Sequence, residues 1–292
     1  KHDGSPESKI TTGASWADHL GRGKKGMEII VCVKQVIDPE EPPSSFSVDE
    51  VANTIVLPSG VPSVISPFDR YAVEAALRIK DASGARVTAL SMGGALNRNV
   101  VRDPVAMGAD ELVLVEDNRL SNGDSWTSAY VLSRAIQKIG GFDLILCGRQ
   151  ASDWDGGQVG AGIAEILGLP CLTFAKKIEI EGDTAIVERV TDEGSEVAAV
   201  PLPALITVSN ELGEPRYPTI KQVMASKRAQ ATEWDTDSLD LDPLLVGQSG
   251  SRTQLRRLYQ PIKENRCEFV TGQNPEDAGA NLALKLREAN II

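Results

Sequence analysis

Apolar and polar positions follow two periods along this chain. Runs of four to six apolar residues, typical of buried strands, occur at 29–33, 87–91, 112–115 and 142–147. Apolar residues that recur every three or four positions predict helices over 66–80, 96–107, 125–139 and 161–167. Pro104 must kink or end the second of these helices. The alternation predicts an α/β fold with a Rossmann-like parallel sheet and helices on both faces.

The C-terminal half has a different pattern. Two short alternating runs, 177–180 and 185–190, flank Glu181-Gly182-Asp183 and predict a hairpin, followed by an apolar strand region over 198–208. Residues 211–218 are too rich in proline for a helix or strand. A short helix is expected over 219–228, an irregular polar stretch over 230–265 and a last helix over 275–289. Residues 38–65, rich in proline and serine, predict an excursion or hairpin.

These patterns divide the chain into three parts. Residues 1–26 are rich in Gly, Ser, Lys and Thr, and they predict a disordered leader or an added extension that ends where Met27 begins the first strand pattern. Residues 27–208 should form a nucleotide-binding α/β domain with hairpin excursions. Residues 209–292 should form a partner-recognition segment and a C-terminal arm.

The most informative stretch is the glycine-rich loop from Gly148 to Gly160, between a predicted strand and a predicted helix. Glycines let the backbone approach a ligand, and the first N–H groups of a helix attract an anion. The loop is neither a Walker loop nor a Gly-x-Gly-x-x-Gly motif. It predicts a phosphate cradle in which Arg149, its one cation, contacts phosphate. The alternative is a plain strand-to-helix connection capped by Asp153 or Asp155.

Other predicted strand ends should converge on the same place. In a parallel sheet, ligands bind beyond the carboxyl ends of the strands. The turn after Val33 and the turn at 91–94 satisfy that description, as does the glycine-rich loop. The helix that begins at 66 should start nearby, with Ser66 as its cap, Pro67 in its first turn and Asp69 as the acid of a capping box.

Composition limits the chemistry. A net charge of −11 argues against nucleic acid and anionic membrane surfaces as partners, and no apolar run is long enough to span a membrane. The only histidines are His2 and His19, so Ser-His catalysis and histidine zinc sites are excluded beyond residue 26; we expect neither catalytic residues nor a metal. Four scattered cysteines predict buried thiols in a reducing compartment, the cytoplasm or, in a eukaryote, the mitochondrial matrix.

Several motifs in series resemble the β subunit of electron transfer flavoproteins, including the FixA-type proteins. The resemblance covers roughly residues 27–228 in the family's order and spacing. The motifs that carry it are Ile-Val-Cys-Val-Lys-Gln-Val-Ile-Asp at 30–38, Ser-Pro-Phe-Asp at 66–69, Ala-Met-Gly-Ala-Asp at 106–110, Gly-Arg-Gln-Ala at 148–151 with Gln158, the Val187-x-Arg189-x-x-Asp192-Glu193-Gly194 signature, and Glu-Pro-Arg-Tyr at 214–217 with Met224.

The resemblance implies an electron carrier that works as a heterodimer with a flavin-bearing α subunit and accepts electrons from acyl-CoA dehydrogenases or similar flavin dehydrogenases. Phe68 would also approach the flavin of the α subunit, and Ile220 and Met224 would bind the dehydrogenase. The residues that would line the nucleotide are Cys32, Ser66, Pro67, Phe68, Asp69, Met92, Gly148, Arg149, Gln150, Ala151, Ser152, Asp153, Trp154, Asp155, Gly156, Gly157, Gln158 and Val159.

The sequence departs from the commonest family pattern in two places. Ala198 stands where a branched aliphatic residue is usual. Many members have Gln-Thr-Gly in the loop and bind AMP, whereas this chain has Gln158-Val159-Gly160 after two glycines. The change removes a hydroxyl donor and adds room, and it resembles the flavin-bifurcating members, in which FAD replaces AMP and NADH is the electron donor. FAD is therefore expected at this site, with AMP as the alternative.

Two other classes share this type of sheet. One is a regulatory module like the universal stress proteins, which the Glu-Pro-Arg-Tyr segment and the long C-terminal extension argue against. The other is an adenylating enzyme of the related ligase class. Such an enzyme needs a phosphate-gripping motif after the first strand, where this chain has Lys-Gln-Val-Ile-Asp-Pro at 34–39.

Overall fold

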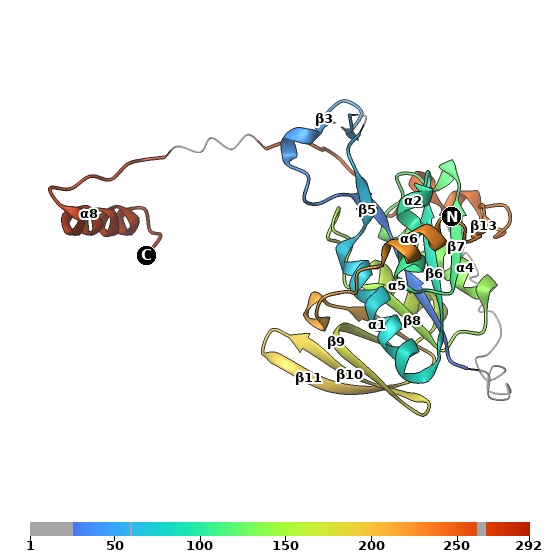
Figure 1. Ribbon diagram of the computed structural model, residues 1–292. Coiled ribbons are helices and arrows are strands. Elements are labelled where there is room, and N and C mark those ends of the chain that lie inside the picture. Colours follow the sequence, from blue (N-terminus) through green and yellow to red (C-terminus); the bar gives the residue numbers. More distant parts are fainter. Residues whose placement is uncertain (1–25, 59, 262–266) are drawn as a thin grey trace, which may run out of the picture. The chain divides into compact units, whose positions relative to one another are not determined.

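The computed structural model describes residues 26–58, 60–261 and 267–292 (Figure 1). The predicted leader therefore lies almost entirely outside the described residues. The chain forms two compact units. The first contains the described residues up to Phe46 together with Leu57–Leu255, and the second contains Ser47–Val56 and Arg256–Ile292. The functional division expected after residue 208 stays a prediction.

A nine-stranded, mostly parallel sheet forms the centre of the first unit, in the order β11-β10-β9-β12-β8-β1-β6-β7-β13 (Figure 1). Its parallel strands are β1 (Glu28–Cys32), β6 (Arg86–Gly93), β7 (Glu111–Glu116), β8 (Leu144–Gly148), β12 (Ala204–Val208) and β13 (Thr232–Trp234). β9 (Cys171–Glu181) pairs parallel with β12 and continues antiparallel into β10 (Thr184–Thr191) and β11 (Gly194–Pro201). The expected α/β architecture is confirmed.

Helices cover both faces of this sheet. On one face, α1 (Pro67–Ser83) places a stripe of small residues, Ala72 and Ala76 among them, against Leu144 and Leu146 of β8. On the other face, α4 (Ser125–Ile139) and α5 (Val159–Leu167) enclose a second core that contains Ile145 of the same strand. Because alternate residues of β8 enter opposite cores, the strand is apolar at nearly every position.

Three expected elements are wrong in detail. The helix expected over 96–107 is two short helices, α2 (Arg98–Val101) and α3 (Asp103–Met107), because Pro104 fits only the first turn of a helix. The strand region expected over 198–208 is two strands, β11 and β12, separated at Leu202 and Pro203. Within the stretch expected to be irregular, β13 pairs in parallel with β7 and extends the sheet.

Shorter elements complete the first unit. They are β2 (Gln35–Ile37), η2 (Pro43–Ser45), β5 (Ser63–Ile65), η3 (Asn118–Leu120), η4 (Asn210–Leu212), α6 (Ile220–Ser226), η5 (Pro243–Leu245) and α7 (Gly247–Gly250). β2 and β5 pair antiparallel. The two ends of the excursion expected over 38–65 are therefore adjacent strands of this unit. No helix in the described ranges is long and apolar enough to cross a membrane.

The second unit is a hairpin with a C-terminal tail. Its hairpin, β3 (Ser47–Asp49) and β4 (Thr54–Val56), binds the tail through Asn53, whose side chain accepts the Leu258 N–H at 2.8 Å. The tail ends in α8 (Pro275–Glu288), which Asn274 caps by accepting the Asp277 N–H at 2.8 Å. No residue of α8 is buried, and Leu282 and Leu284 are exposed.

Candidate nucleotide site

The predicted site lies where three neighbouring strands end. β8, β1 and β6 are adjacent and parallel, and Cys32 at the end of β1 is paired in register with Cys147 of β8. The turn after β1, the turn after β6 and the glycine-rich loop after β8 therefore leave the same edge of the sheet. This is the edge at which ligands bind in open parallel sheets.

Asp69 joins two of these loops. Its carboxylate accepts the Lys34 N–H at 2.8 Å and the Gly148 N–H at 3.2 Å, so one buried side chain ties the turn after β1 to the start of the glycine-rich loop. The Ser66 side chain makes no capping hydrogen bond. The backbone N–H of Ser66 donates to the Lys34 carbonyl at 2.8 Å. The capping box expected for Ser66 and Asp69 is wrong, because Asp69 satisfies N–H groups outside its own helix.

Burial raises the pKa of Asp69 to about 7. The two N–H donors and the nearby charge of Lys34 oppose this rise in pKa, and the carboxylate of Asp153 adds to it. Burial therefore disfavours the charged form of Asp69 at this edge of the sheet.

The glycine-rich loop is braced by its own side chains. Asp153 forms an ion pair with Lys34 at 2.7 Å, and Asp155 accepts a hydrogen bond from Gln150 at 2.8 Å. Neither aspartate caps α5, so the cap that the alternative interpretation expected at Asp153 or Asp155 is wrong. The helix begins at Val159 after Gln158, which makes no side-chain cap. Its first N–H groups are therefore left for an anion.

Two glycines of the loop have identifiable structural roles. A Cβ on Gly148 would lie 2.5 Å from Asp69 Oδ1 and 2.6 Å from the carbonyl carbon of Phe68, so only glycine allows β8 to pass the start of α1. Gly157 has a left-handed φ of +61°, which side chains rarely adopt. Trp154, between them, is exposed.

Arg149 lies among aromatic side chains. Its guanidinium lies over the Phe68 ring at 4.8 Å and the Phe174 ring at 6.0 Å, and one nitrogen donates to Ser209 Oγ at 3.5 Å. Across the described part of the chain it has no carboxylate within ion-pair distance, and its buried Nε has no hydrogen-bond partner. Its charge helps to lower the pKa of nearby Glu211, but no ion pair with another described residue neutralises it directly.

Sulfur atoms and unpaired hydroxyls both occur near this edge of the sheet, with Cys32, Cys147 and Met92 on the face covered by α4 and α5 and Ser91, by the alternation of β6, on the face covered by α1. Cys32 and Cys147 are buried side by side, and the Cys32 thiol, together with burial, raises the pKa of Cys147. Met92 packs half-buried on the same core. The hydroxyls of Ser66, Ser91 and Ser152, at the start of α1, in β6 and in the glycine-rich loop, are buried without a hydrogen-bond partner among the described residues.

These features fit a nucleotide. Buried hydroxyls without partners are costly unless a ligand binds them, and an uncapped helix start and a free guanidinium suit phosphate. The sequence places the turns that contain Lys34 and Ser91 at this edge, but it does not single out either side chain as a candidate ligand contact. Ser91 could have been found as a polar residue in an apolar strand, and Lys34 by its place directly after β1.

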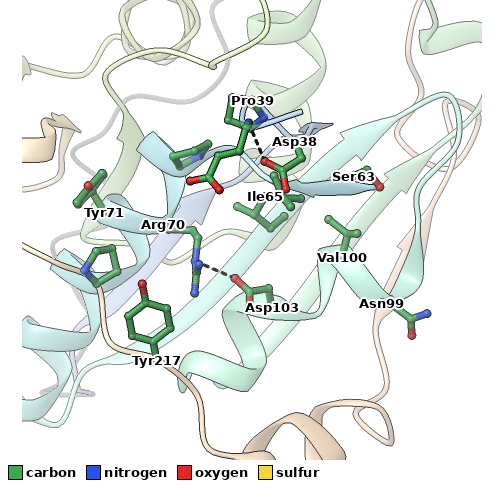
Figure 2. Close-up of a pocket in the computed structure, with 14 residues that line it drawn as sticks. Asp38, Pro39, Ser63, Ile65, Arg70, Tyr71, Asn99, Val100, Asp103 and Tyr217 are labelled. Carbon is green, nitrogen blue, oxygen red and sulfur yellow. Dashed lines mark hydrogen bonds and ion pairs between the residues drawn. The ribbon is translucent and has the colours of Figure 1, made fainter. Parts of the chain in front are cut away.

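A cavity of about 580 Å³ lies elsewhere in this unit. It is enclosed by β5, the first turn of α1, helix α2 and the segment at 215–217. Figure 2 shows that Arg70, Asp103 and Tyr217 lie close together at this cavity; Arg70 pairs with Asp103 at 3.2 Å. Asp38 and Glu40 also line it, so carboxylates outnumber its one guanidinium. That charge disfavours a phosphate and leaves the glycine-rich loop as the better nucleotide site.

A family model described as "Electron transfer flavoprotein domain" matches residues 54–239. The chain belongs to the electron transfer flavoprotein family. The predicted resemblance is thereby confirmed, and the universal-stress and adenylating alternatives are set aside.

Individual relatives match most of the chain. The chain is 41% identical to "Electron transfer flavoprotein subunit beta" of Megasphaera elsdenii over 80% of its length and 88% of that protein's. It is 38% identical to "Caffeyl-CoA reductase-Etf complex subunit CarD" of Acetobacterium woodii over 91% and 100%. It is 35% identical to "Protein FixA" of Azorhizobium caulinodans over 80% and 85%. An electron transfer flavoprotein β subunit implies an α-subunit partner.

The segment that resembles the family's partner-recognition motif is held to α1 by ion pairs. Arg216 of the Glu-Pro-Arg-Tyr run binds the buried Glu74 of α1 at 2.8 Å and Asp81 at 2.8 Å. Burial alone would raise the pKa of Glu74, but hydrogen bonds from Arg216 and Arg78 outweigh it and lower that pKa. These bonds fix the chain immediately before α6.

Helix α6 presents its apolar residues to solvent. Thr219 and Gln222 form a capping box at its start. Ile220 is 84% exposed and Met224 is 54% exposed, so neither residue packs into the core of its own unit. Exposed apolar side chains on a rigidly held helix are typical of a docking surface.

Proposed function

We propose that this chain is the β subunit of a heterodimeric electron transfer flavoprotein that carries electrons between flavin dehydrogenases and other redox partners, with FAD rather than AMP in its nucleotide site. The observation that carries this proposal is the cradle itself, formed by the uncapped start of α5, the unpaired guanidinium of Arg149 and the unpartnered serine hydroxyls. The family supplies the flavin-linked chemistry.

Loop width supports FAD over AMP. A Cβ added at Gly156 would meet only Ser125 Oγ, at 3.5 Å, which is an ordinary contact. Gly157 has no side chain, so it adds no bulk to the loop. Val159 begins α5 without a hydroxyl that would favour a single phosphate. Two relatives of this chain are named for caffeyl-CoA and acryloyl-CoA reductases, which supports a CoA-ester redox partner. A bifurcating role with NADH as donor rests on the resemblance of the loop to the flavin-bifurcating members.

A bound FAD would supply the electron-accepting chemistry, and the protein would position it. N–H groups of the glycine-rich loop and of α5 would bind its phosphates, with Arg149 contributing charge. Asp69 would hold the loop at the strand edge, while Cys32 and Met92 would line the inner wall. The absence of histidine beyond residue 26 agrees with a role in positioning rather than proton transfer.

The second unit supports an α-subunit partner. Its helix α8 has no buried residue, and it exposes Leu282 and Leu284 together with Ile291 and Ile292 just beyond its end. Apolar side chains in such a tail are covered when another chain binds it. Free thiols at all four cysteines are compatible with the proposed compartment, the cytoplasm or, in a eukaryote, the mitochondrial matrix.

Gly157→Val should lower the flavin count of the purified heterodimer from two to one. Valine resists the left-handed φ of +61°, and its branches would enter the path of the phosphates. The matched control is Gly182→Val, which imposes the same strain at φ +61° in the β9–β10 turn, where nothing lies within 4 Å. Flavin is quantified after heat release. An equal loss in both variants would mean that strain, and not the site, is responsible.

Ile220→Asp should slow electron delivery from the dehydrogenase by about tenfold or more without loss of flavin, because it places a charge in an interface that needs an apolar anchor. The side chain is exposed, so folding should be unaffected. Leu244→Asp, at a residue that is 74% exposed in η5, is the control for an added surface charge. The measurement is the rate of flavin reduction with increasing dehydrogenase. Flavin loss in Ile220→Asp would place the residue in the core and contradict the assignment.

A further inference from the structure

A second cavity, of about 380 Å³, opens beside the nucleotide loop at the ends of β9 and β10. We call it the arginine pocket. It is lined by Arg149, Phe174, Arg189, Val190, Thr191 and Asp192. Arg189 and Asp192 belong to the family signature that the nucleotide site leaves unexplained. Only Arg149 is shared with the nucleotide loop.

The lining of the arginine pocket contains two guanidinium groups and one carboxylate. Arg149 makes no ion pair among the described residues, although its charge helps to lower the pKa of nearby Glu211, while Arg189 pairs with Glu196 at 3.1 Å and donates to Thr173 at 3.0 Å. The Nε atoms of both arginines are buried without a hydrogen-bond partner. Asp192 is the one carboxylate in the lining. In a chain of net charge −11, two guanidinium groups gathered at one pocket favour an anionic occupant.

Phe174 forms an apolar wall of the arginine pocket, and its backbone is strained. Its φ of +61° is left-handed, which is uncommon for a bulky residue, and the ring is 41% exposed. Its N–H donates to Thr207 Oγ1 at 3.1 Å, where the register between β12 and β9 shifts. A strained backbone that holds an aromatic ring at the surface beside Arg149 is typical of a binding surface.

The composition of the wall points to a protein partner. An arginine pair with an exposed phenylalanine and a valine combines charge with apolar contact, as at the centres of protein interfaces. The guanidinium of Arg149 lies over Phe68 at the nucleotide edge. A chain seated in the arginine pocket would therefore lie next to the nucleotide site, where a flavin-bearing partner must come for electrons to pass.

We propose that the arginine pocket receives an acidic side chain of the α subunit, whose carboxylate lies beside the guanidinium group of Arg189, while Arg149 serves the nucleotide. The apolar neighbours of that side chain pack on Phe174 and Val190. This inference rests on the proposed heterodimer.

Arg189→Gln tests the proposal without altering the nucleotide loop. The dissociation constant of the heterodimer should rise about 10- to 100-fold, because removal of one partner from a buried interfacial ion pair is costly. High salt should weaken the wild-type heterodimer more than the variant. The control is Arg86→Gln, which removes an exposed arginine paired with Glu111 at the opposite end of the sheet strands. Its dissociation constant should match that of the wild type.

Val190→Asp is the second variant, and it adds a negative charge beside the expected carboxylate. It should weaken the heterodimer at least as much as Arg189→Gln, with an unchanged circular dichroism spectrum. If the wild type binds the α subunit and both variants bind equally well, the arginine pocket is not part of the interface. If affinity is kept while bound nucleotide is lost, the pocket serves the nucleotide and the inference is wrong. Failure of the wild-type chain to bind an α subunit would overturn the proposed function as well.

Discussion

Gly148→Ala should lower the free energy of unfolding by about 2–4 kcal/mol and release the bound nucleotide. The added Cβ would lie 2.5 Å from Asp69 Oδ1, 2.6 Å from the Phe68 carbonyl carbon and 2.8 Å from the Asp69 N. Two of these three atoms are backbone, so no rotation of a side chain can relieve the contact. Either the end of β8 or the start of α1 must move, and both support the site.

The comparison for this variant is Gly156→Ala in the same loop. A Cβ there would meet only Ser125 Oγ at 3.5 Å, which is an ordinary contact. Urea denaturation of the purified heterodimer and its nucleotide content provide the two measurements. Equal denaturation midpoints for the two variants would contradict the close packing of Gly148 against Asp69.

Asp69→Asn should remove a large part of the pH dependence of stability. Burial raises the pKa of Asp69 to about 7 in the folded chain, against about 4 in an unfolded one. Between these values the folded state holds a proton that the unfolded state has released, so the free energy of unfolding falls as pH rises. The fall should be on the order of 3–4 kcal/mol at most and should level off above the folded pKa.

The variant has no titratable group at this position, so its stability should decline less across the same pH range. Asparagine can also accept only one of the two N–H groups, from Lys34 and Gly148, that the carboxylate accepts. Urea midpoints at several pH values for both proteins provide the measurement, and groups such as Asp117, whose pKa is lowered in both, cancel in the difference. Parallel curves would show that Asp69 does not titrate in this range.

The sequence predicted the central sheet and the glycine-rich loop after β8 because both depend on local patterns. Apolar runs marked β1, β6, β7 and β8, and the glycines marked the loop that follows β8. The sequence could not show that Asp69 serves the loops after β1 and β8, because those N–H groups lie 35 and 79 residues from it in the chain. Its position in α1 favoured a local capping box, and long-range hydrogen bonding prevailed.

Other differences have equally specific causes. Thr232–Trp234 is short and half polar, and it becomes β13 only because the edge of β7 is available for pairing. The left-handed Phe174 leaves no signal in the sequence, because an aromatic residue predicts ordinary strand backbone. The arginine pocket therefore becomes visible only when β9, β10 and the nucleotide loop are brought together.

The most direct test of this account is the identity and amount of nucleotide released by heat from the purified heterodimer. The account predicts two FAD per heterodimer and no AMP, because one FAD belongs to the α subunit and the glycine-rich loop of this chain holds the other. One FAD with one AMP would contradict the proposed flavin site and leave the electron-carrier role intact. One FAD with no second adenine nucleotide would contradict the role assigned to the loop, and with it the central claim.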